Sequence, residues 1–357
     1  MAVGAVLLLL ALPATIACLY YAVGWIVGRF PRRVARRTPL HSIAILIPAH
    51  DEEIELPKAL ASIAQADYPT HLISIWVVAD HCADATAEIA RRSGAECLVR
   101  TGSPLRGKGH AVALGLSKLL PTGPDAVLIL DADCRMSPGL LRRCDAELED
   151  AAEAVQCAVV SVCDPISAVS IVAAVGAHLD NRMASAADRL GRSAPLRGTG
   201  MLFARSVLER HPWIATGLAE DAEYAAELRR HNVAVRFAAG ESVACAAPPR
   251  AEAFFGQRRR WRAALRIRHA GVWFASKPVI LLHLVLSVAA CCAVGDGWLI
   301  IWSLILVGLT AAIYADAMLA VGVLWPGFRS IWLVGRLAVV ALGCFGSRET
   351  RWQRTPR

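Results

Sequence analysis

The stretch AVLILDADCRMSP, Ala126 to Pro138, decides how this chain folds. Its five apolar residues lead directly into Asp131 and Asp133. A short, continuous apolar run predicts a strand that is buried on both faces. In sheets built from such strands, ligands bind beyond the carboxyl ends of the strands. The two carboxylates therefore stand where a binding site is expected.

Two other stretches have the same form. IAILIPAHDEE, Ile43 to Glu53, opens with an apolar strand that should stop at Pro48, and ISIWVVAD, Ile73 to Asp80, precedes a turn and a helix that ends near Gly94. Apolar runs that alternate with helical patterns predict an α/β fold, a mostly parallel sheet with helices on both faces. The polar residues that follow the three strands then converge on one edge of the sheet.

Carboxylates at this edge have a specific chemical use. One can hold Mg²⁺ or Mn²⁺, which bridges to a diphosphate, while the other orients a sugar hydroxyl or a metal-bound water. Asp also caps strand ends and turns for purely structural reasons. The neighbouring motifs favour the functional interpretation.

A flexible loop supplies a cation near this edge. Lys108 lies in RGKGH, Arg106 to His110, before an expected helix over Ala111–Leu120. Gly102 to Lys108 matches most of the phosphate loop GxxxxGK[ST], but Gly109 offers no hydroxyl at the last position. A lysine that touches a nucleotide is favoured over a nucleoside triphosphatase loop; a solvated loop lysine is the structural alternative.

Acidic and basic motifs follow later in the chain. Glu220 and Asp221 open an expected helix in Gly217–Val233, where they suit the helix dipole and also offer a general base. FFGQRRRWRAALRIRH, Phe254 to His269, carries six arginines. Lipid headgroups explain such a basic run, but not the Gln257-x-x-Arg260-Trp261 spacing.

The composition indicates a membrane protein. Of the residues 56% are hydrophobic and the mean hydropathy is +0.46, too apolar for an ordinary soluble domain. Residues 2–28 carry no charge and are long enough to span a bilayer, and arginines follow them from Arg29 to Arg37. The positive-inside rule places the amino terminus outside and the next domain in the cytoplasm. A cleaved signal peptide is the alternative.

The carboxyl-terminal region repeats this pattern. Pro278–Val294 and Trp298–Ala315 predict a transmembrane hairpin with an external turn at Gly295-Asp296-Gly297. The 15 residues of Ile331–Phe345 reach only about 22 Å as a helix, so we expect an interfacial helix with Arg329 and Arg336 on its wet face. The net charge of +8 gathers beside these segments, which indicates a membrane surface and no nucleic acid.

These features divide the chain and set its location. The expected parts are an anchor (1–28), a cytoplasmic domain (40–262), a basic juxtamembrane segment (263–277), a hairpin (278–325), and an interfacial helix with a basic tail (326–357). We expect a multi-pass protein of the inner cell membrane. The eleven cysteines show no CxxC pair and are interpreted as reduced cytosolic thiols.

Taken in order, the motifs PAHDEE, VVAD, GKG, DAD, GTG, AED and QRRRW carry a resemblance. They resemble the membrane-integrated family 2 glycosyltransferases, which include cellulose, chitin and hyaluronan synthases and ceramide glucosyltransferases. The resemblance covers roughly residues 43–262. Each motif alone is weak, whereas the ordered set is highly specific.

The resemblance implies a GT-A fold, inversion at the sugar carbon and a set of site residues. The donor and its nucleotide would contact Pro48, His50, Glu52, Asp80, Lys108, Asp131 and Asp133, with Asp133 on Mg²⁺ or Mn²⁺. The acceptor and diphosphate would contact Gly198, Thr199, Gly200, Gln257, Arg260 and Trp261. Asp221, beside Glu220, would be the catalytic base. Ala219 departs from the Thr often found before Glu-Asp, and three spans are fewer than the long polymer synthases have.

The expected activity is therefore that of an inverting glycosyltransferase. We expect its donor to be a nucleotide diphosphate sugar, in the family pattern a UDP-sugar. We expect its acceptor to be a lipid, a lipid-linked group or a polysaccharide at the cytoplasmic membrane face. A processive exopolysaccharide synthase is the alternative within this class. A membrane NTPase or transporter component that uses the Gly102–Lys108 loop is the alternative from another class.

Overall fold

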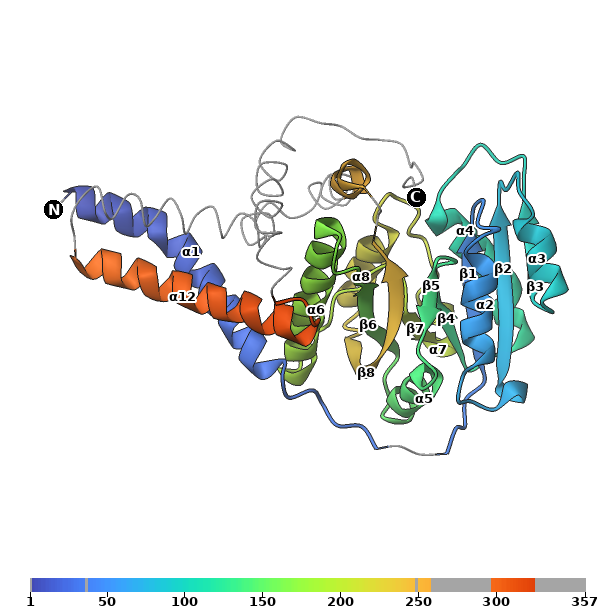
Figure 1. Ribbon diagram of the computed structural model, residues 1–357. Coiled ribbons are helices and arrows are strands. Elements are labelled where there is room, and N and C mark those ends of the chain that lie inside the picture. The colour runs from blue at the N-terminus through green and yellow to red at the C-terminus, as the bar shows by residue number, and fades with distance from the viewer. Residues whose placement is uncertain (1, 36–37, 248–249, 258–296, 325–357) are drawn as a thin grey trace. The chain divides into compact units, whose positions relative to one another are not determined.

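The computed structural model describes residues 2–35, 38–247, 250–257 and 297–324 (Figure 1). They belong to two compact units. We call the first the α/β unit, Phe30–Val162 with Ala187–Ala246. The second, the helical unit, comprises Met1–Arg29, Cys163–Ala186 and Ala247–Arg357.

An eight-stranded sheet with the order β3-β2-β1-β4-β7-β6-β8-β5 runs through the α/β unit. Its strands are β1 (Ile43–Ala49), β2 (Ile73–Asp80), β3 (Glu96–Arg100), β4 (Ala126–Ile129), β5 (Cys134–Met136), β6 (Ala154–Val162), β7 (Met201–Ala204) and β8 (Val235–Ala246). The neighbours β3-β2-β1-β4 are all parallel, as the sequence predicts for its three apolar runs. Their carboxyl ends therefore share one edge.

The other half of the sheet is mixed. β7 pairs antiparallel with both β4 and β6, β5 pairs antiparallel with β8, and β6 pairs parallel with β8. The prediction of a mostly parallel sheet is thus correct for the first half, whereas the second half combines antiparallel pairs with the parallel pair of β6 and β8. Apolar alternation fixes which face of a strand is buried, but the direction of its partner depends on chain connections that alternation does not encode.

Helices cover both faces of the sheet, as predicted. The helices of this unit are α2 (Leu56–Ala64), α3 (Thr86–Arg92), α4 (Lys108–Leu119), α5 (Leu140–Glu149), α7 (Arg205–Arg210) and α8 (Glu220–Arg230), with short 3₁₀ turns at Thr70–Leu72 and Leu120–Thr122. Ile45 of β1 faces the core cluster that α2 and α5 complete. Leu46, the next residue, points the other way and lies against Gly115 of α4. This alternation is the strand period of two.

A disulfide joins Cys134 to Cys245 across the paired strands β5 and β8. The expectation that all cysteines are free thiols is wrong for this pair. The two residues are 111 positions apart, and the antiparallel register of β5 and β8 places them directly opposite each other. Sequence spacing alone does not reveal such a pairing.

In the helical unit, α1 (Ala2–Val27) lies beside α12 (Gly297–Ala320) (Figure 1). Trp302 donates to Thr15 at 3.2 Å, and Trp25 donates to Asp316 at 2.6 Å. The contacts advance in the same order along both helices, so the two helices run parallel. α6 (Ala168–Arg189) packs its apolar residues against the carboxyl-terminal halves of this pair.

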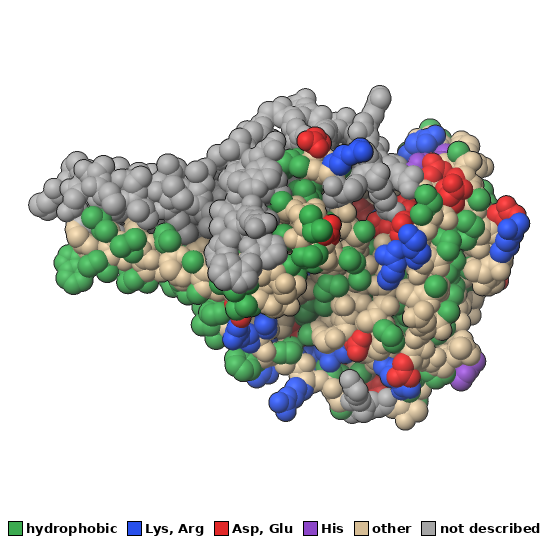
Figure 2. Space-filling model, in the orientation of Figure 1, with side chains coloured by type: hydrophobic (Ala, Val, Ile, Leu, Met, Phe, Trp, Pro, Cys, Tyr) green, Lys and Arg blue, Asp and Glu red, His purple; other side chains and the backbone are tan. Residues whose placement is uncertain are grey.

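Large apolar side chains cover the outside of the helix pair. Figure 2 shows hydrophobic atoms along the flank formed by α12. The exposed side chains include Ile16, Leu19, Tyr20, Val23 and Ile26 of α1, and Trp298, Ile301, Leu304, Ile305 and Leu319 of α12. Within the described residues, Ile300–Ala320 is long and apolar enough to cross a membrane, and Thr15–Val27 is a shorter apolar helix.

The structure confirms helices at two of the expected membrane segments, residues 2–28 and Trp298–Ala315. Whether they cross a bilayer stays a prediction. The expected segments Pro278–Val294 and Ile331–Phe345 lie outside the described residues.

Candidate active site

The side chains predicted for the site meet at the carboxyl edge of the parallel strands. β1 ends at Ala49 and β2 at Asp80, while Asp131 follows closely on β4. Figure 2 shows acidic side chains gathered over the region where β1 and β2 end in Figure 1. The convergence of charged groups expected from the sequence is therefore present.

Lys108 is the centre of one group of site residues. Its Nζ lies 2.5 Å from Asp131 Oδ1 and 3.6 Å from Glu220 Oε1. It also donates a hydrogen bond of 2.5 Å to the carbonyl oxygen of Gly198. The lysine side chain is mostly buried, whereas that of Asp131 is 32% exposed. Asp131 thus keeps an open side toward a ligand.

The position of Lys108 follows from the start of α4. The helix begins at this lysine, next to Gly107, which has a φ of 128°. A Cβ at Gly109 would collide with the backbone of Ala215 and Thr216. Glycine at this position lets α4 approach the loop that leads into α8. Close packing therefore requires glycine at position 109, where the triphosphatase motif has a serine or threonine.

Glu220 and Asp221 enter the site from the first turn of α8, as predicted. Tyr224, one turn later, is fully buried and packs edge-on against Phe203 of β7, with ring centroids 5.3 Å apart. Its hydroxyl donates to the carbonyl oxygen of His211 at 2.7 Å. This aromatic anchor fixes the helix, and the helix fixes the two carboxylates.

Burial and crowding of like charge alter the acidity of these groups. Burial raises the pKa of Glu220 to about 7, with Lys108 opposing and Asp221 reinforcing the shift. Burial also raises the pKa of Asp221, which Lys108 lowers and Asp131 raises. Burial alone would lower the pKa of Lys108, but Asp131 and Glu220 outweigh it and raise that pKa. Lys108 is therefore a fixed cation, and Glu220 and Asp221 are stronger bases than ordinary carboxylates.

The Gly198-Thr199-Gly200 segment completes this group. The backbone N–H of Asp131 donates to Thr199 Oγ1 at 3.0 Å. Gly198 has a φ of +79°, and a Cβ there would lie 3.7 Å from Asp221 Oδ2. The segment predicted to border the acceptor thus bonds to the predicted donor contact Asp131 and lies close to the predicted base Asp221.

A second group of predicted residues lies at the ends of β1 and β2. Asp80 is buried, and its Oδ1 accepts from Arg100 Nη1 at 2.5 Å and lies 2.6 Å from His81 Nδ1. His50 Nδ1 donates to the carbonyl oxygen of Asp80 at 2.6 Å. The backbone N–H of Glu52 donates to Thr86 Oγ1 at 2.7 Å. Pro48 lies within β1, which continues one residue beyond this predicted end, to Ala49.

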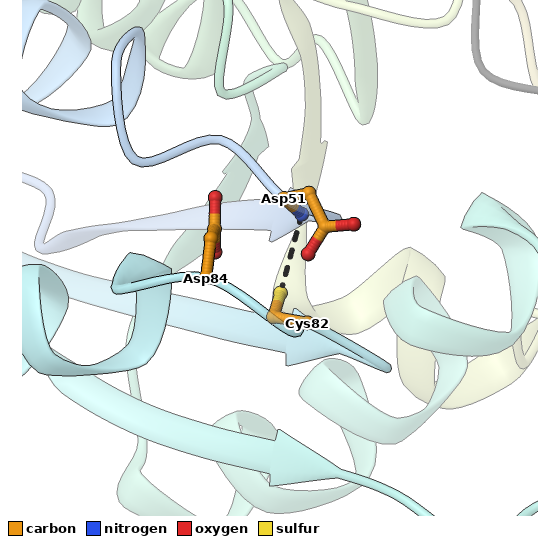
Figure 3. A group of neighbouring side chains, drawn as sticks. All are labelled: Asp51, Cys82 and Asp84. Atoms are coloured by element: carbon orange, nitrogen blue, oxygen red, sulfur yellow. Dashed lines mark hydrogen bonds between the residues drawn. The ribbon is translucent and has the colours of Figure 1, made fainter.

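Asp51, Cys82 and Asp84 are close enough to be considered as a metal site (Figure 3). The Asp51 N–H donates to Cys82 Sγ, and Asp51 Oδ1 accepts from Ala83 N at 2.7 Å. Asp84 accepts from the backbone N–H groups of Glu53 and Thr86. These bonds interlock the loops after β1 and β2 and explain the cluster as a structural junction.

Asp131 and Asp133 fit a hard divalent ion better. Their carboxylate oxygens and Cys134 Sγ lie within 4.8 Å of one another. Cys134 is in a disulfide and offers no thiolate, so the donor set is oxygen alone. Two carboxylates suit Mg²⁺ or Mn²⁺, which commonly keep waters and take phosphate oxygens as further ligands. The predicted metal role of Asp133 agrees with this donor set.

The geometry described above does not include three predicted residues. Gln257 lies in the helical residues 251–257 of the helical unit, and Arg260 and Trp261 lie outside the described residues. Sequence reasoning in turn missed Gln156, a fully buried polar residue in β6. Its signal was a single amide within the apolar run AVQCAVV.

Comparison with known proteins identifies the domain. Residues 39–264 match the protein family described as "Glycosyltransferase like family 2". The chain belongs to this family. The family domain contains both groups of site residues, and its range agrees with the region of resemblance, roughly 43–262, expected from the motifs. The glycosyltransferase class expected from the sequence is thereby confirmed.

Two curated relatives match parts of the chain. The 4,4'-diaponeurosporenoate glycosyltransferase of Staphylococcus haemolyticus is 38% identical over 100 residues, 27% of this chain and 25% of that protein. The beta-monoglucosyldiacylglycerol synthase of Synechocystis is 24% identical over 245 residues, 67% of this chain and 51% of that protein. The chain thus spans about half the length of the second relative and a quarter of the first.

A solved structure resembles nearly the whole chain. The mannosyltransferase PcManGT from Pyrobaculum calidifontis, in complex with GDP-Man and Mn²⁺, has a TM-score of 0.60 at 20% identity. The similarity covers 96% of this chain and 98% of that one. At this identity the likeness concerns the fold, which is GT-A-like.

Proposed function

We propose that this family 2 glycosyltransferase is an inverting enzyme. It transfers one sugar from a nucleotide diphosphate sugar to a hydroxyl of a lipid or lipid-linked acceptor at the cytoplasmic face of the inner membrane. The observation that carries the proposal is the buried cluster of Lys108, Asp131, Glu220 and Asp221 at the carboxyl edge of the sheet.

Asp221 is the proposed base. Its raised pKa makes it a better proton acceptor than an exposed carboxylate. It takes the proton from the acceptor hydroxyl as the new oxygen–carbon bond forms on one face of the sugar. The bond to the diphosphate breaks on the opposite face, and its electron pair leaves with the phosphate. Attack opposite the leaving group inverts the configuration at the sugar carbon.

Lys108 and the two aspartates after β4 are assigned to the donor. Lys108 holds Asp131 from one side, so the carboxylate is fixed in direction while its exposed side meets the donor. Asp133 and Asp131 would hold Mg²⁺ or Mn²⁺. When bound, this ion supplies charge that neutralises the departing diphosphate. The interlocked loops around Asp80 are assigned to the nucleoside.

The names of the relatives favour a lipid acceptor. One is a diaponeurosporenoate glycosyltransferase and the other a monoglucosyldiacylglycerol synthase. The exposed apolar flank of α1 and α12 agrees with an acceptor that resides in a membrane. Trp298 and Trp302 at the start of α12 are exposed, as residues of a membrane interface commonly are.

The parallel arrangement of α1 and α12 supports the proposed topology. Phe254 packs on Val169 and Ala173 of α6, which itself packs on the carboxyl-terminal halves of the pair. α12 begins at the opposite end of the pair, and its 24 residues are about 36 Å long. A parallel pair has both amino-terminal ends on the same side, which agrees with the expected external turn at Gly295-Asp296-Gly297. With the crossing expected from the sequence at Pro278–Val294, α1 and α12 make up the three spans of the proposal.

A donor screen tests the proposed function. Membranes that contain the chain are incubated with a panel of UDP- and GDP-sugars, and lipid extracts are analysed by mass spectrometry. We expect a new lipid that is heavier by one sugar residue with one class of donor. Cleavage of ATP or GTP without any sugar transfer would contradict the proposal and favour a nucleoside triphosphatase. A ladder of many added sugars would instead indicate a processive polysaccharide synthase.

A further inference from the structure

Gln156 lies on β6 with no exposed surface. A buried primary amide is unfavourable unless its donors and its acceptor are satisfied. Here Nε2 donates to the carbonyl oxygens of Thr199 at 2.9 Å and Cys157 at 2.8 Å, and Oε1 accepts from the backbone N–H of Arg197 at 2.8 Å. The N–H of Arg197 needs an acceptor, and the carbonyl oxygens of Thr199 and Cys157 need a donor. The side-chain amide can therefore adopt only the orientation with Oε1 toward Arg197 and Nε2 toward the carbonyls.

These bonds connect β6 to the loop that shapes the site. The amide of Gln156 forms hydrogen bonds with the loop at Arg197 and at Thr199. The backbone N–H of the next residue, Cys157, donates to the carbonyl oxygen of Gly200 at 2.8 Å. The loop runs through two glycines in the left-handed region, with φ of +79° at Gly198 and +63° at Gly200. A segment of this kind has few other restraints on its conformation.

The same loop contacts the reacting groups. Gly198 accepts from Lys108 Nζ, and Thr199 accepts from the backbone N–H of Asp131. Gly198 also lies beside Asp221. A shift of the loop would therefore move Lys108, Asp131 and the space in front of Asp221 together.

We propose that Gln156 is a positioning residue for the transfer reaction. It sets the position of the Arg197–Gly200 loop and acts on the reaction through Gly198 and Thr199, without touching substrate. This inference rests on the proposed function and adds to it a residue that none of the motifs contains. Misplacement of a site by about 1 Å can lower a rate about 100-fold, so a positioning role has a measurable signature.

Two variants separate positioning from folding. Gln156→Met keeps the length of the side chain and removes all of its hydrogen bonds. Gln156→Glu keeps the shape and the acceptor for Arg197, but an ionised carboxylate faces the carbonyl oxygens of Cys157 and Thr199. When that carboxyl is protonated, its O–H donates to one of these carbonyls and restores the bond.

The matched control is Tyr68→Phe. Tyr68 is also buried in the α/β unit, and its hydroxyl donates to the carbonyl oxygen of His41 at 2.6 Å and to Asp145 Oδ1 at 2.9 Å. The control removes these buried hydrogen bonds, neither of which involves the Arg197–Gly200 loop. It reports what lost stability alone does to the enzyme.

The experiment measures the transfer rate per nucleotide site. The full chain is purified in lipid nanodiscs, and binding of UDP or GDP counts the folded sites. The maximal transfer rate divided by that number gives kcat per nucleotide site. We expect Gln156→Met to keep its nucleotide sites and lose about 10- to 100-fold in kcat per site. Tyr68→Phe should keep wild-type kcat per site. The ratio of Gln156→Glu to wild-type kcat should rise as the pH falls.

The outcomes distinguish this inference from the proposed function. If the wild-type chain transfers no sugar, the proposed function fails. If the wild type transfers sugar and Gln156→Met has wild-type kcat per site, the positioning role is refuted. Loss of the nucleotide sites themselves in both Gln156 variants would equally overturn it, because Gln156 would then hold the fold rather than the site.

Discussion

Lys108 is a single cation among three carboxylates. The charges of Asp131, Glu220 and Asp221 all raise its pKa. The cluster therefore carries an excess of negative charge before a donor arrives. A negatively charged diphosphate approaches such a cluster favourably only with a compensating cation, which agrees with the oxygen ligands at Asp131 and Asp133.

Glu220 makes the folding stability depend on pH. Its pKa is raised from 4.5 to about 7 in the folded protein, so the folded state holds a proton that the unfolded state has lost. The stability that this proton contributes is fully present below a pH of about 4.5 and is lost as the pH rises through about 7. Glu220→Gln removes this titration. Its melting temperature relative to wild type should therefore be higher at pH 8 than at pH 5.

Thermal unfolding at the two pH values checks this expectation. Glu88→Gln, which replaces an exposed carboxylate on α3, is the control and should show no comparable trend. An equal change in melting temperature for Glu220→Gln at pH 5 and pH 8 would show that the Glu220 carboxyl titrates normally.

Asp133 should support metal-dependent donor binding. Transfer should stop when EDTA removes divalent ions and return with Mg²⁺ or Mn²⁺. Asp133→Ala should weaken Mn²⁺ binding in the presence of UDP or GDP by at least about tenfold. Even the loss of a group that only hydrogen-bonds to a metal ligand typically lowers metal affinity by about that factor. Titration calorimetry gives this affinity independently of activity. Full transfer in excess EDTA is the result that would remove the metal from the account.

At the level of secondary-structure elements, the strands that carry the site were predictable and the rest of the sheet was not. Each of the first three apolar runs becomes a parallel strand, and its polar end residues reach one edge. β7, in contrast, pairs with β4 across a long stretch of sequence: Ala126 lies opposite Ala204, 78 positions later. Its direction follows from the path of α6, which no local pattern encodes.

The same limit applies to the site. The positions of Asp131 and Asp221 were predictable because charged residues follow or begin regular elements. Lys108 was expected in a flexible loop before a helix at Ala111–Leu120, whereas it is the first residue of α4. Gln156 supports them from the middle of a strand, where a polar residue is easily taken for an imperfection of an apolar run. Its role depends on a contact with Thr199, which is 43 residues away.

The disulfide between β5 and β8 should stabilise the α/β unit. It closes a loop of more than a hundred residues, and disulfides typically contribute about 2–4 kcal/mol by restricting the unfolded chain. Wild-type protein should therefore melt at a lower temperature after reduction with dithiothreitol. The Cys134→Ser, Cys245→Ser double variant should not respond to the reductant. Identical melting of oxidised and reduced wild type, with reduction verified by thiol labelling, would contradict this role.

For the whole molecule, the helical unit bears on the compartment of the reaction. The arginines after residue 28 and the basic run before Pro278 need to face the same side of the membrane, and three spans satisfy both. The interfacial helix that we expect from the sequence at Ile331–Phe345 would keep the basic tail on that side as well. The proposed arrangement thus gives the site access to cytoplasmic nucleotide sugars.

Cysteine labelling tests this topology in intact cells. In a variant without native cysteines, Asp296→Cys should react with a membrane-impermeant thiol reagent, and Thr355→Cys should react only after the cells are broken. Labelling of Thr355→Cys from outside would overturn the three-span arrangement and make Ile331–Phe345 a crossing.

The central claim is that Asp221 is the base of a sugar transfer. Its most direct test compares transfer and donor binding in Asp221→Asn, which keeps the acceptor for Ala222 N and removes the basicity. Glu223→Gln, on the same turn of α8, is the matched control. We predict that Asp221→Asn binds UDP or GDP as wild type does and transfers sugar about 10²- to 10⁴-fold more slowly. Wild-type transfer by Asp221→Asn would contradict the account.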